Sequence, residues 1–296
     1  MSLGTLLTAI VTPFTENLEI DEACFVDLMH HLAAQGSDGF VVCGTTGEAS
    51  TLTDDEHLRM IELACKNRPS GVRIVAGAGS NHTRHAVHLT ERATELGADA
   101  ILSVTPYYNK PNRCGIVEHY RQVAKATDKP IILYNIPSRT GLDLPNDFLA
   151  SLAQIEHVDY IKQANNASLA HVDGLGLYAG NDEMFARVLD MGGCGVISVA
   201  SHVVGGRMRQ MIQNPEQRAR LNAELLPIYE ALFVTTNPIP VKAALNMIGR
   251  PVGGLRLPLI EASAAVSHDI RAALERVGLL HRTPISSNAE LHQGYA

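Results

Sequence analysis

The chain has 296 residues, of which 46% are hydrophobic and 19% charged, a composition that excludes a largely disordered protein and suffices for a full core. Its formal net charge is -7 and it has no basic run, so we expect no nucleic-acid partner. The sequence has no long apolar span, no N-terminal leader pattern and no CxxC pair among its 5 cysteines. We therefore expect a cytoplasmic protein that contacts no membrane.

Strand-like apolar runs alternate with helix-like patterns along most of the chain. The candidate strands span residues 5–12, 39–43, 73–76, 100–104, 131–134, 158–162, 177–179 and 195–199. Candidate helices include 81–96, 116–127, 182–191 and a short one at 168–175, and Thr53 with Glu56 has capping-box spacing. Eight such units predict an α/β fold, the (β/α)8 or TIM barrel. An open dinucleotide-binding sheet is disfavoured, because Gly77-Ala78-Gly79 lacks the third glycine of its fingerprint.

The pattern after the eighth candidate strand stays helical for longer than one barrel helix requires. We therefore predict a (β/α)8 catalytic barrel over residues 1–221 and a C-terminal helical subdomain over residues 222–280. The polar remainder, residues 281–296, is predicted to be a weakly ordered tail.

One lysine, Lys162, ends the apolar run 158–162. A lysine ammonium in water has a pKa near 10.4, and burial disfavours the charged form, so a buried lysine can offer a nucleophilic amine. Such a residue is typical of enzymes that form a Schiff base with a carbonyl substrate. The alternative is a strand-end lysine whose stem packs while its ammonium reaches water or a carboxylate.

Polar residues follow several of the other candidate strands, at the barrel end where active sites lie. The Gly44–Glu48 turn offers backbone N–H groups and hydroxyls to a carboxylate. Tyr134 shares a strand face with Ile132, so its phenol is expected inside the barrel, where it can transfer protons. Arg139 offers a bidentate fork to a second carboxylate. Each feature alone has a structural explanation, but their combination around an interior lysine favours an imine-forming enzyme acting on an α-keto acid.

Five segments together resemble the dihydrodipicolinate synthase family, within the pyruvate-dependent class I aldolases and lyases, over roughly residues 3–280. They are Gly44-Thr45-Thr46-Gly47-Glu48, Thr105-Pro106-Tyr107-Tyr108-Asn109-Lys110-Pro111, Tyr134-Asn135-Ile136-Pro137-Ser138-Arg139-Thr140-Gly141, Ile161-Lys162 and Asn237-Pro238-Ile239-Pro240-Val241-Lys242. The first and fourth are shared with the wider superfamily, whereas the arginine segment and the last segment are more specific to the synthases.

This resemblance implies a synthase that condenses pyruvate with L-aspartate 4-semialdehyde to 4-hydroxy-tetrahydrodipicolinate, on the diaminopimelate route to lysine. It implies that Lys162 forms the imine and that Thr45, Tyr108 and Tyr134 relay protons, with Tyr108 reaching across from a neighbouring subunit. No organic cofactor or metal is implied, and the expected assembly is a homotetramer, a dimer of dimers.

The resemblance also implies four substrate-binding positions. Thr46 and the backbones of Gly180 and Ile197 match pyruvate-site positions, and Arg139 matches the group that binds the semialdehyde carboxylate. The family often has Lys-Glu-Ala after the sixth strand, whereas this chain has Gln163 after its lysine, so the wall near Gly180 is expected to differ.

A second departure concerns the inhibitor site of the lysine-inhibited family members. His57, Asn81 and Tyr107 match that site, but Asp54 stands in place of a histidine and His85 in place of a glutamate. The carboxylate that would hold the lysine ammonium is missing from its place, and weak or absent inhibition by lysine is expected.

Two other functions remain open from the sequence. The same lysine chemistry could serve a lyase or aldolase acting on a 2-keto-3-deoxy sugar acid, sialic acid or 4-hydroxy-2-oxoglutarate, although Arg139 suits a short acidic aldehyde better. The barrel could also bind a metabolite without converting it. His82, His85 and His88 share a helix face, but they lack the spacing and further ligands that a metal site needs.

Overall fold

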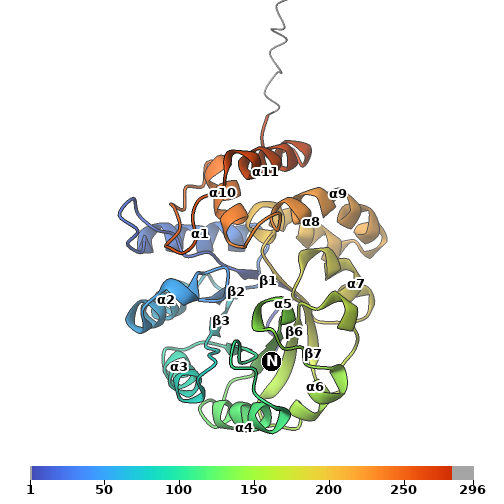
Figure 1. Ribbon diagram of the computed structural model, residues 1–296. Helices are drawn as coiled ribbons and strands as arrows, with labels where there is room; N and C mark the ends of the chain where they lie inside the picture. Colours follow the sequence, from blue (N-terminus) through green and yellow to red (C-terminus); the bar gives the residue numbers. More distant parts are fainter. Residues whose placement is uncertain (1, 282–296) are drawn as a thin grey trace, which may run out of the picture.

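The computed structural model describes residues 2–281, and within that range eight parallel strands close into a barrel in chain order (Figure 1). The strands are β1 (Leu6–Ala9), β2 (Gly39–Val42), β3 (Arg73–Gly77), β4 (Ala100–Val104), β5 (Ile131–Asn135), β6 (Val158–Gln163), β7 (Gly176–Ala179) and β8 (Gly195–Ser198). The predicted (β/α)8 barrel is therefore confirmed, and the strand positions differ from the expected ones only at their ends.

Helices surround the strands, as expected for parallel strands joined by crossover connections. They are α1 (Glu22–Ala34), α2 (Asp54–Asn67), α3 (Thr83–Glu95), α4 (Arg113–Ala124), α5 (Pro137–Thr140), α6 (Asn146–Leu152), α7 (Phe185–Asp190) and α8 (Ser201–Gln213). The predicted capping box begins α2: the Thr53 hydroxyl accepts from the Glu56 N–H at 3.2 Å, and the Glu56 carboxylate accepts from the Thr53 N–H at 2.9 Å.

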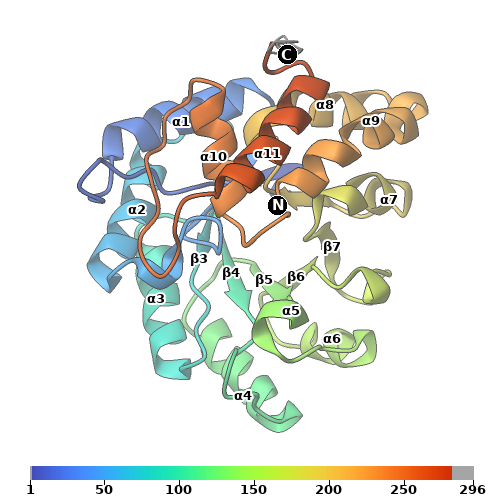
Figure 2. The same cartoon turned by 45° about the horizontal axis from the view of Figure 1, so that its top comes forward.

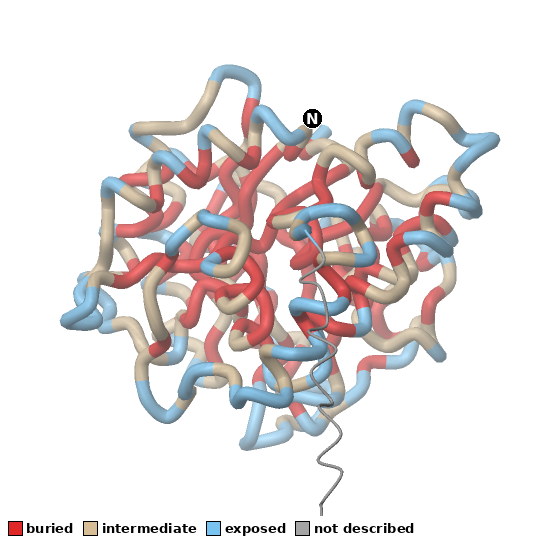
Figure 3. The backbone as a smooth tube through the Cα atoms, turned by 90° about the horizontal axis from the view of Figure 1, so that it is seen from above, coloured by how far each residue is buried: buried red, intermediate tan, exposed pale blue. Residues whose placement is uncertain are grey.

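Two apolar layers stabilise the barrel, and the two-residue period of a strand assigns each side chain to one of them. Ile132 and Tyr134 pack in the inner cluster, whereas Leu133 and Ile161 pack between the strands and the helices. Lys162, next to Ile161 on β6, therefore points into the barrel. Buried residues are concentrated in this central region of the molecule, and exposed residues lie mainly at its periphery (Figure 3).

The segment 168–175 does not form the predicted helix. A short 3-10 turn, Asn166–Ser168, is followed by an antiparallel bridge between Val172 and Leu175, and Gly174 adopts φ +81° within it. The dipeptide Asp-Gly favours a turn, because glycine adopts the left-handed backbone conformation without a steric penalty. The helix prediction rested only on the length of chain between Lys162 and Gly180, and the Asp173-Gly174 turn interrupts that segment.

Three further helices follow the barrel; the first two pack against α8, and the third packs against the first two (Figure 2). They are α9 (Arg218–Ala231), α10 (Ile239–Met247) and α11 (Ala264–Arg276). The expected division after residue 221 falls inside α9 and stays a prediction. The predicted tail, residues 281–296, lies outside the described residues except for His281. No helix within residues 2–281 has the length and apolarity needed to cross a membrane.

Candidate active site

Lys162 lies inside the mouth of the barrel beside Tyr134. The two residues are register partners on the neighbouring strands β6 and β5, so their Cα atoms sit side by side. The Lys162 side chain is 6% exposed, and its Nζ lies 4.3 Å from the centroid of the Tyr134 ring. Among the described residues it forms no ion pair. An amine held against a phenol without a carboxylate partner is the arrangement that imine chemistry requires.

The turn after β2 brings two hydroxyls to the same end of the barrel. Its backbone is tightly folded, with φ +54° at both Cys43 and Glu48 and a hydrogen bond from the Gly47 N–H to the Gly44 carbonyl at 3.1 Å. A Cβ at Gly47 would lie 3.1 Å from the carbonyl oxygen of Ile10, so glycine permits this close packing. Non-glycine residues in the left-handed region often mark functional loops.

A cavity of about 480 Å³ joins several of the predicted site residues, and Thr45, Tyr134 and Arg139 all contribute to its wall. Lys162 is not among the described residues that line this cavity, but it contacts one of them, Tyr134. The lining thus includes hydroxyl, phenol and guanidinium groups, which suits a small substrate with carboxylate and carbonyl groups.

Asn237 connects two other predicted residues. Its side-chain Nδ2 donates to the Thr46 hydroxyl at 2.9 Å, and its backbone carbonyl oxygen accepts from the Arg139 guanidinium at 3.2 Å. Thr46 is buried and Arg139 is exposed, so the arginine has donors left for a ligand.

The last two predicted binding positions lie at the end of β7 and on β8, the two strands that follow β6 around the barrel. Gly180 follows β7 and its N–H donates to the Gln163 carbonyl at 2.7 Å, while the Ile197 side chain is buried in the inner cluster from β8. A Cβ at Gly180 would approach the Cβ of Ala164 to 2.7 Å, which explains the glycine. Gln163 is buried, and its Oε1 accepts from the amide of Asn135 at 3.1 Å.

Tyr108 does not join the other residues within this chain. Its side chain is 88% exposed, its backbone has φ +70°, and it is absent from the described cavity wall. On the predicted histidine face, His85 bonds to Asp54 at 3.0 Å and to Ser80 at 3.3 Å. Residues 2–281 contain no group of three or more His, Cys, Asp or Glu side chains placed to hold a metal ion.

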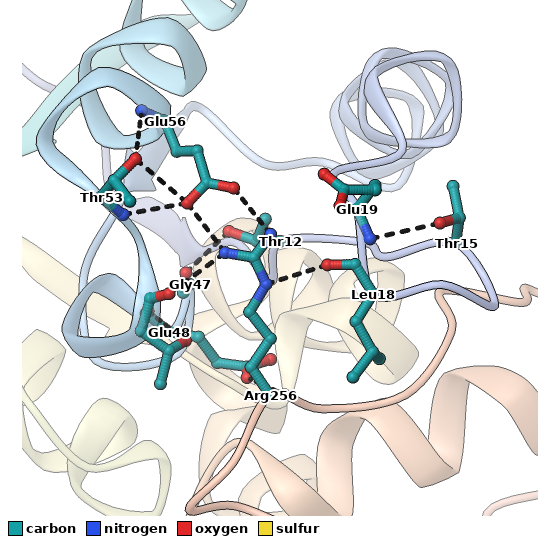
Figure 4. Close-up of polar contacts among 10 residues, drawn as sticks. Thr12, Thr15, Leu18, Glu19, Gly47, Glu48, Thr53, Glu56 and Arg256 are labelled. Atoms are coloured by element: carbon teal, nitrogen blue, oxygen red, sulfur yellow. Dashed lines mark hydrogen bonds and ion pairs between the residues drawn. The ribbon is translucent and has the colours of Figure 1, made fainter.

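The sequence interpretation assigned no role to a polar cluster beneath the turn. Lys242 of α10 forms a fully buried ion pair with Glu48 at 2.8 Å, and the Arg256 N–H donates to the same carboxylate at 3.2 Å. The Arg256 side chain reaches Glu56 and the Leu18 carbonyl (Figure 4). The signal in the sequence was a lysine within the otherwise apolar run Pro240–Leu245.

The Arg256–Glu56 pair predicts a pH-dependent stability. The bidentate hydrogen bond from Arg256, assisted by the Thr53 N–H and the arginine charge, lowers the pKa of Glu56 from 4.5 to about 2. A lowered carboxyl pKa stabilises the fold above the ordinary pKa, and the effect is lost as the pH falls towards the folded value. Because the pair is partly exposed, we expect Glu56→Gln to lower the free energy of unfolding by about 1–2 kcal/mol at pH 7.

Urea denaturation of the wild type and Glu56→Gln at pH 7, 5 and 3 measures this effect. The difference in unfolding free energy should shrink by about half or more between pH 5 and pH 3. A difference that stays constant over this range would argue against the charge interaction.

An interior lysine beside a phenol, at the carboxyl end of a closed (β/α)8 barrel, is the arrangement of a class I aldolase-type lyase. The profile of the dihydrodipicolinate synthetase family matches residues 2–277. The chain belongs to this family.

Individual relatives agree with this assignment. A 4-hydroxy-tetrahydrodipicolinate synthase of Thermosynechococcus vestitus is 44% identical over 290 residues, which cover 94% of this chain and 98% of that protein. The solved structure of the Cyanidioschyzon merolae enzyme with lysine bound has a TM-score of 0.89 at 39% identity, covering 94% of this chain and 99% of that chain. The structure of the chloride-inhibited Acinetobacter baumannii dihydrodipicolinate synthase complexed with pyruvate has a TM-score of 0.90 at 36% identity. The match covers 94% of this chain and 100% of that chain.

Proposed function

We propose that this chain is a 4-hydroxy-tetrahydrodipicolinate synthase, which condenses pyruvate with L-aspartate 4-semialdehyde. The Lys162 amine attacks the keto carbon of pyruvate, and loss of water leaves an imine. Removal of a methyl proton gives an enamine, whose carbon forms a bond to the aldehyde carbon of the semialdehyde. The amino group of the added substrate then attacks the imine carbon, which closes the ring and releases Lys162 as a free amine.

Each step moves a proton, and we assign that work to Tyr134, Thr45 and Tyr108. Tyr134 contacts Lys162 directly and Thr45 shares its cavity, which supports their part in the relay. Tyr108 is 88% exposed on its own chain, which supports a role in the site of a neighbouring subunit. We therefore propose that the enzyme works as a homotetramer, a dimer of dimers, in the cytoplasm.

The substrate carboxylates have separate proposed partners. The turn bearing Thr45 and Thr46 binds the pyruvate carboxylate, with the backbones of Gly180 and Ile197 facing the keto acid from the neighbouring strands. The Arg139 guanidinium, which lines the same cavity as Thr45, binds the semialdehyde carboxylate. The proposal needs no organic cofactor or metal, because the lysine supplies the electron sink.

The observation that carries the proposal is the buried contact between Lys162 and Tyr134 inside the barrel mouth. Coupled assays with pyruvate and either aspartate 4-semialdehyde or aldehydes derived from 2-keto-3-deoxy sugar acids, sialic acid and 4-hydroxy-2-oxoglutarate test the substrate. We expect turnover when pyruvate is combined with aspartate 4-semialdehyde, and none when it is combined with the other aldehydes. Faster turnover of a sugar-acid substrate would identify a related aldolase, and no turnover of any substrate would favour a barrel that only binds metabolites.

Replacing Arg139 tests the assignment of the second carboxylate. We expect Arg139→Gln to raise the KM for the semialdehyde by about 10- to 100-fold, because a charge-assisted hydrogen bond is lost, while the KM for pyruvate stays within about twofold. Arg113→Gln is a matched control, since Arg113 is an exposed arginine that pairs with Asp147 at 3.8 Å. An equal rise in both KM values would place Arg139 elsewhere in the reaction.

Inhibition by lysine tests the second departure from the family pattern. Asp54 and His85 bond to each other at 3.0 Å, so a bound amino acid would have to compete with this bond, and the matching glutamate is missing. We expect L-lysine at about 1 mM to reduce the initial rate by less than half. Half-inhibition at a much lower concentration would show that the Asp54–His85 pair opens to bind the amino acid.

A further inference from the structure

The C-terminal helices contact the turn after β2 through a charge pair that is entirely out of water. The side chains of Lys242 and Glu48 are 1% and 0% exposed, and Nζ lies 2.8 Å from Oε1. The same ammonium donates to the Thr12 carbonyl at 2.9 Å and lies 4.3 Å from the centroid of the Phe14 ring. Burial lowers the pKa of Lys242, and the charge of Glu48 opposes that shift.

A buried pair of this kind is weak evidence for stability. Removing two charges from water carries a large desolvation penalty, and apolar residues of similar volume often stabilise a fold equally well. The Lys242–Glu48 pair does impose a fixed position, however, because each charge must meet its partner and its hydrogen bonds with good geometry. Such a pair is therefore suited to fixing the position of the segments that it joins.

The Glu48 carboxylate anchors the end of the turn that carries Thr45 and Thr46. One oxygen accepts from Lys242, and the other accepts from the Arg256 N–H at 3.2 Å. The Glu48 backbone is held at φ +54°, a conformation that a non-glycine residue keeps only when its surroundings require it. Its N–H donates to the Thr45 carbonyl at 3.2 Å, so the anchored residue is bonded directly to the proposed binding residue.

The same C-terminal segment reaches the turn at a second point. Asn237, which is 6% exposed, donates to the Thr46 hydroxyl at 2.9 Å. This bond orients the hydroxyl of Thr46, because its oxygen accepts from the amide and its proton remains available for another acceptor. The segment from Asn237 to Lys242 thus holds the turn at Thr46 and at Glu48.

We propose that Glu48, Lys242 and Asn237 are positioning residues, which hold the Gly44–Glu48 turn in the geometry that binds the keto-acid carboxylate. The inference rests on the proposed function, because it assumes that this turn receives pyruvate. A turn held in advance binds its ligand without first losing conformational freedom, so releasing it weakens pyruvate binding more than it slows the later steps. None of the three residues needs to touch the substrate.

The test measures imine formation without the second substrate. Enzyme is incubated with increasing pyruvate and borohydride, and the pyruvate concentration that gives half-maximal inactivation is compared among wild type, Lys242→Met, Asn237→Ala and the double variant Glu48→Gln/Lys242→Met. We expect this concentration to rise by about tenfold or more in each variant, while kcat at saturating pyruvate stays within about threefold. Arg250→Met is the matched control, because Arg250 also links the C-terminal region to the barrel, through Asp27 of α1 at 3.4 Å, but away from the turn.

A purely structural role would lower the melting temperature of the folded variants and leave their half-saturating pyruvate concentration unchanged, which would overturn the proposal. If Lys242→Met does not fold, Asn237→Ala decides the outcome, since it removes one hydrogen bond and leaves no buried charge unpaired. Imine formation by the wild type distinguishes a failure of this inference from a failure of the proposed function. If it forms no imine, the proposed function fails; if it forms one and the folded variants bind pyruvate normally, the positioning role alone fails.

Discussion

We expect replacement of Lys162 by alanine to lower kcat/KM by at least about 10³-fold, because the variant lacks the amine that is proposed to form the imine. Lys162 is buried, points into the barrel and contacts the Tyr134 ring, so its loss removes the nucleophile without removing a surface charge. Steady-state assays with pyruvate and aspartate 4-semialdehyde measure the effect, and circular dichroism verifies that the variant is folded.

Lys66→Ala is the control for the loss of a lysine. Lys66 is 64% exposed and pairs with Glu62 on the surface of α2, so its removal should leave kcat/KM unchanged. If folded Lys162→Ala keeps more than about a tenth of the wild-type activity, the covalent mechanism is wrong.

Tyr134→Phe is expected to lower kcat by about 10² to 10⁴-fold, the usual contribution of a positioned general acid or base. The ring that packs against Lys162 remains in this variant, and only the hydroxyl is lost. Pyruvate binding should change little, because the proposed carboxylate contacts lie on the turn after β2. Pre-steady-state measurement of imine formation can then show which proton transfer has slowed.

Tyr178→Phe is a matched control for that loss. Tyr178 is also buried in the inner cluster and is the register partner of Lys162 on β7, but its hydroxyl donates to the Gly4 carbonyl at 2.8 Å, away from the cavity. Its replacement should change kcat by less than about threefold, since it affects only one buried hydrogen bond. Equal losses in the two variants would mean that the Tyr134 hydroxyl has a structural role.

The architecture could be predicted because each barrel strand leaves a local signal. A short apolar run with a helical pattern after it recurs along the chain, and parallel strands in that order close in only a few ways. Side chains two residues apart on a strand share a face, so the position of Tyr134 two residues after Ile132 predicted that its side chain faces the barrel interior. The helix predicted at 168–175 was wrong because it rested only on the length of chain between Lys162 and Gly180, and the Asp173-Gly174 turn occupies that segment instead.

The site was predictable only where its residues follow strands. Lys162, Tyr134 and the turn after β2 converge because the fold collects strand ends at one rim. The Lys242–Glu48 pair joins residues far apart in the sequence, and no local pattern reports such a contact. Tyr108 illustrates a further limit, because it is 88% exposed on this chain and its proposed role depends on a neighbouring subunit.

Borohydride reduction in the presence of pyruvate, followed by mass mapping of peptides, tests the central claim most directly. The reduced imine of pyruvate should be found on the peptide that contains Lys162, and on no other lysine at comparable yield. An adduct on a different lysine, or no pyruvate-dependent adduct, would contradict a mechanism built on this amine.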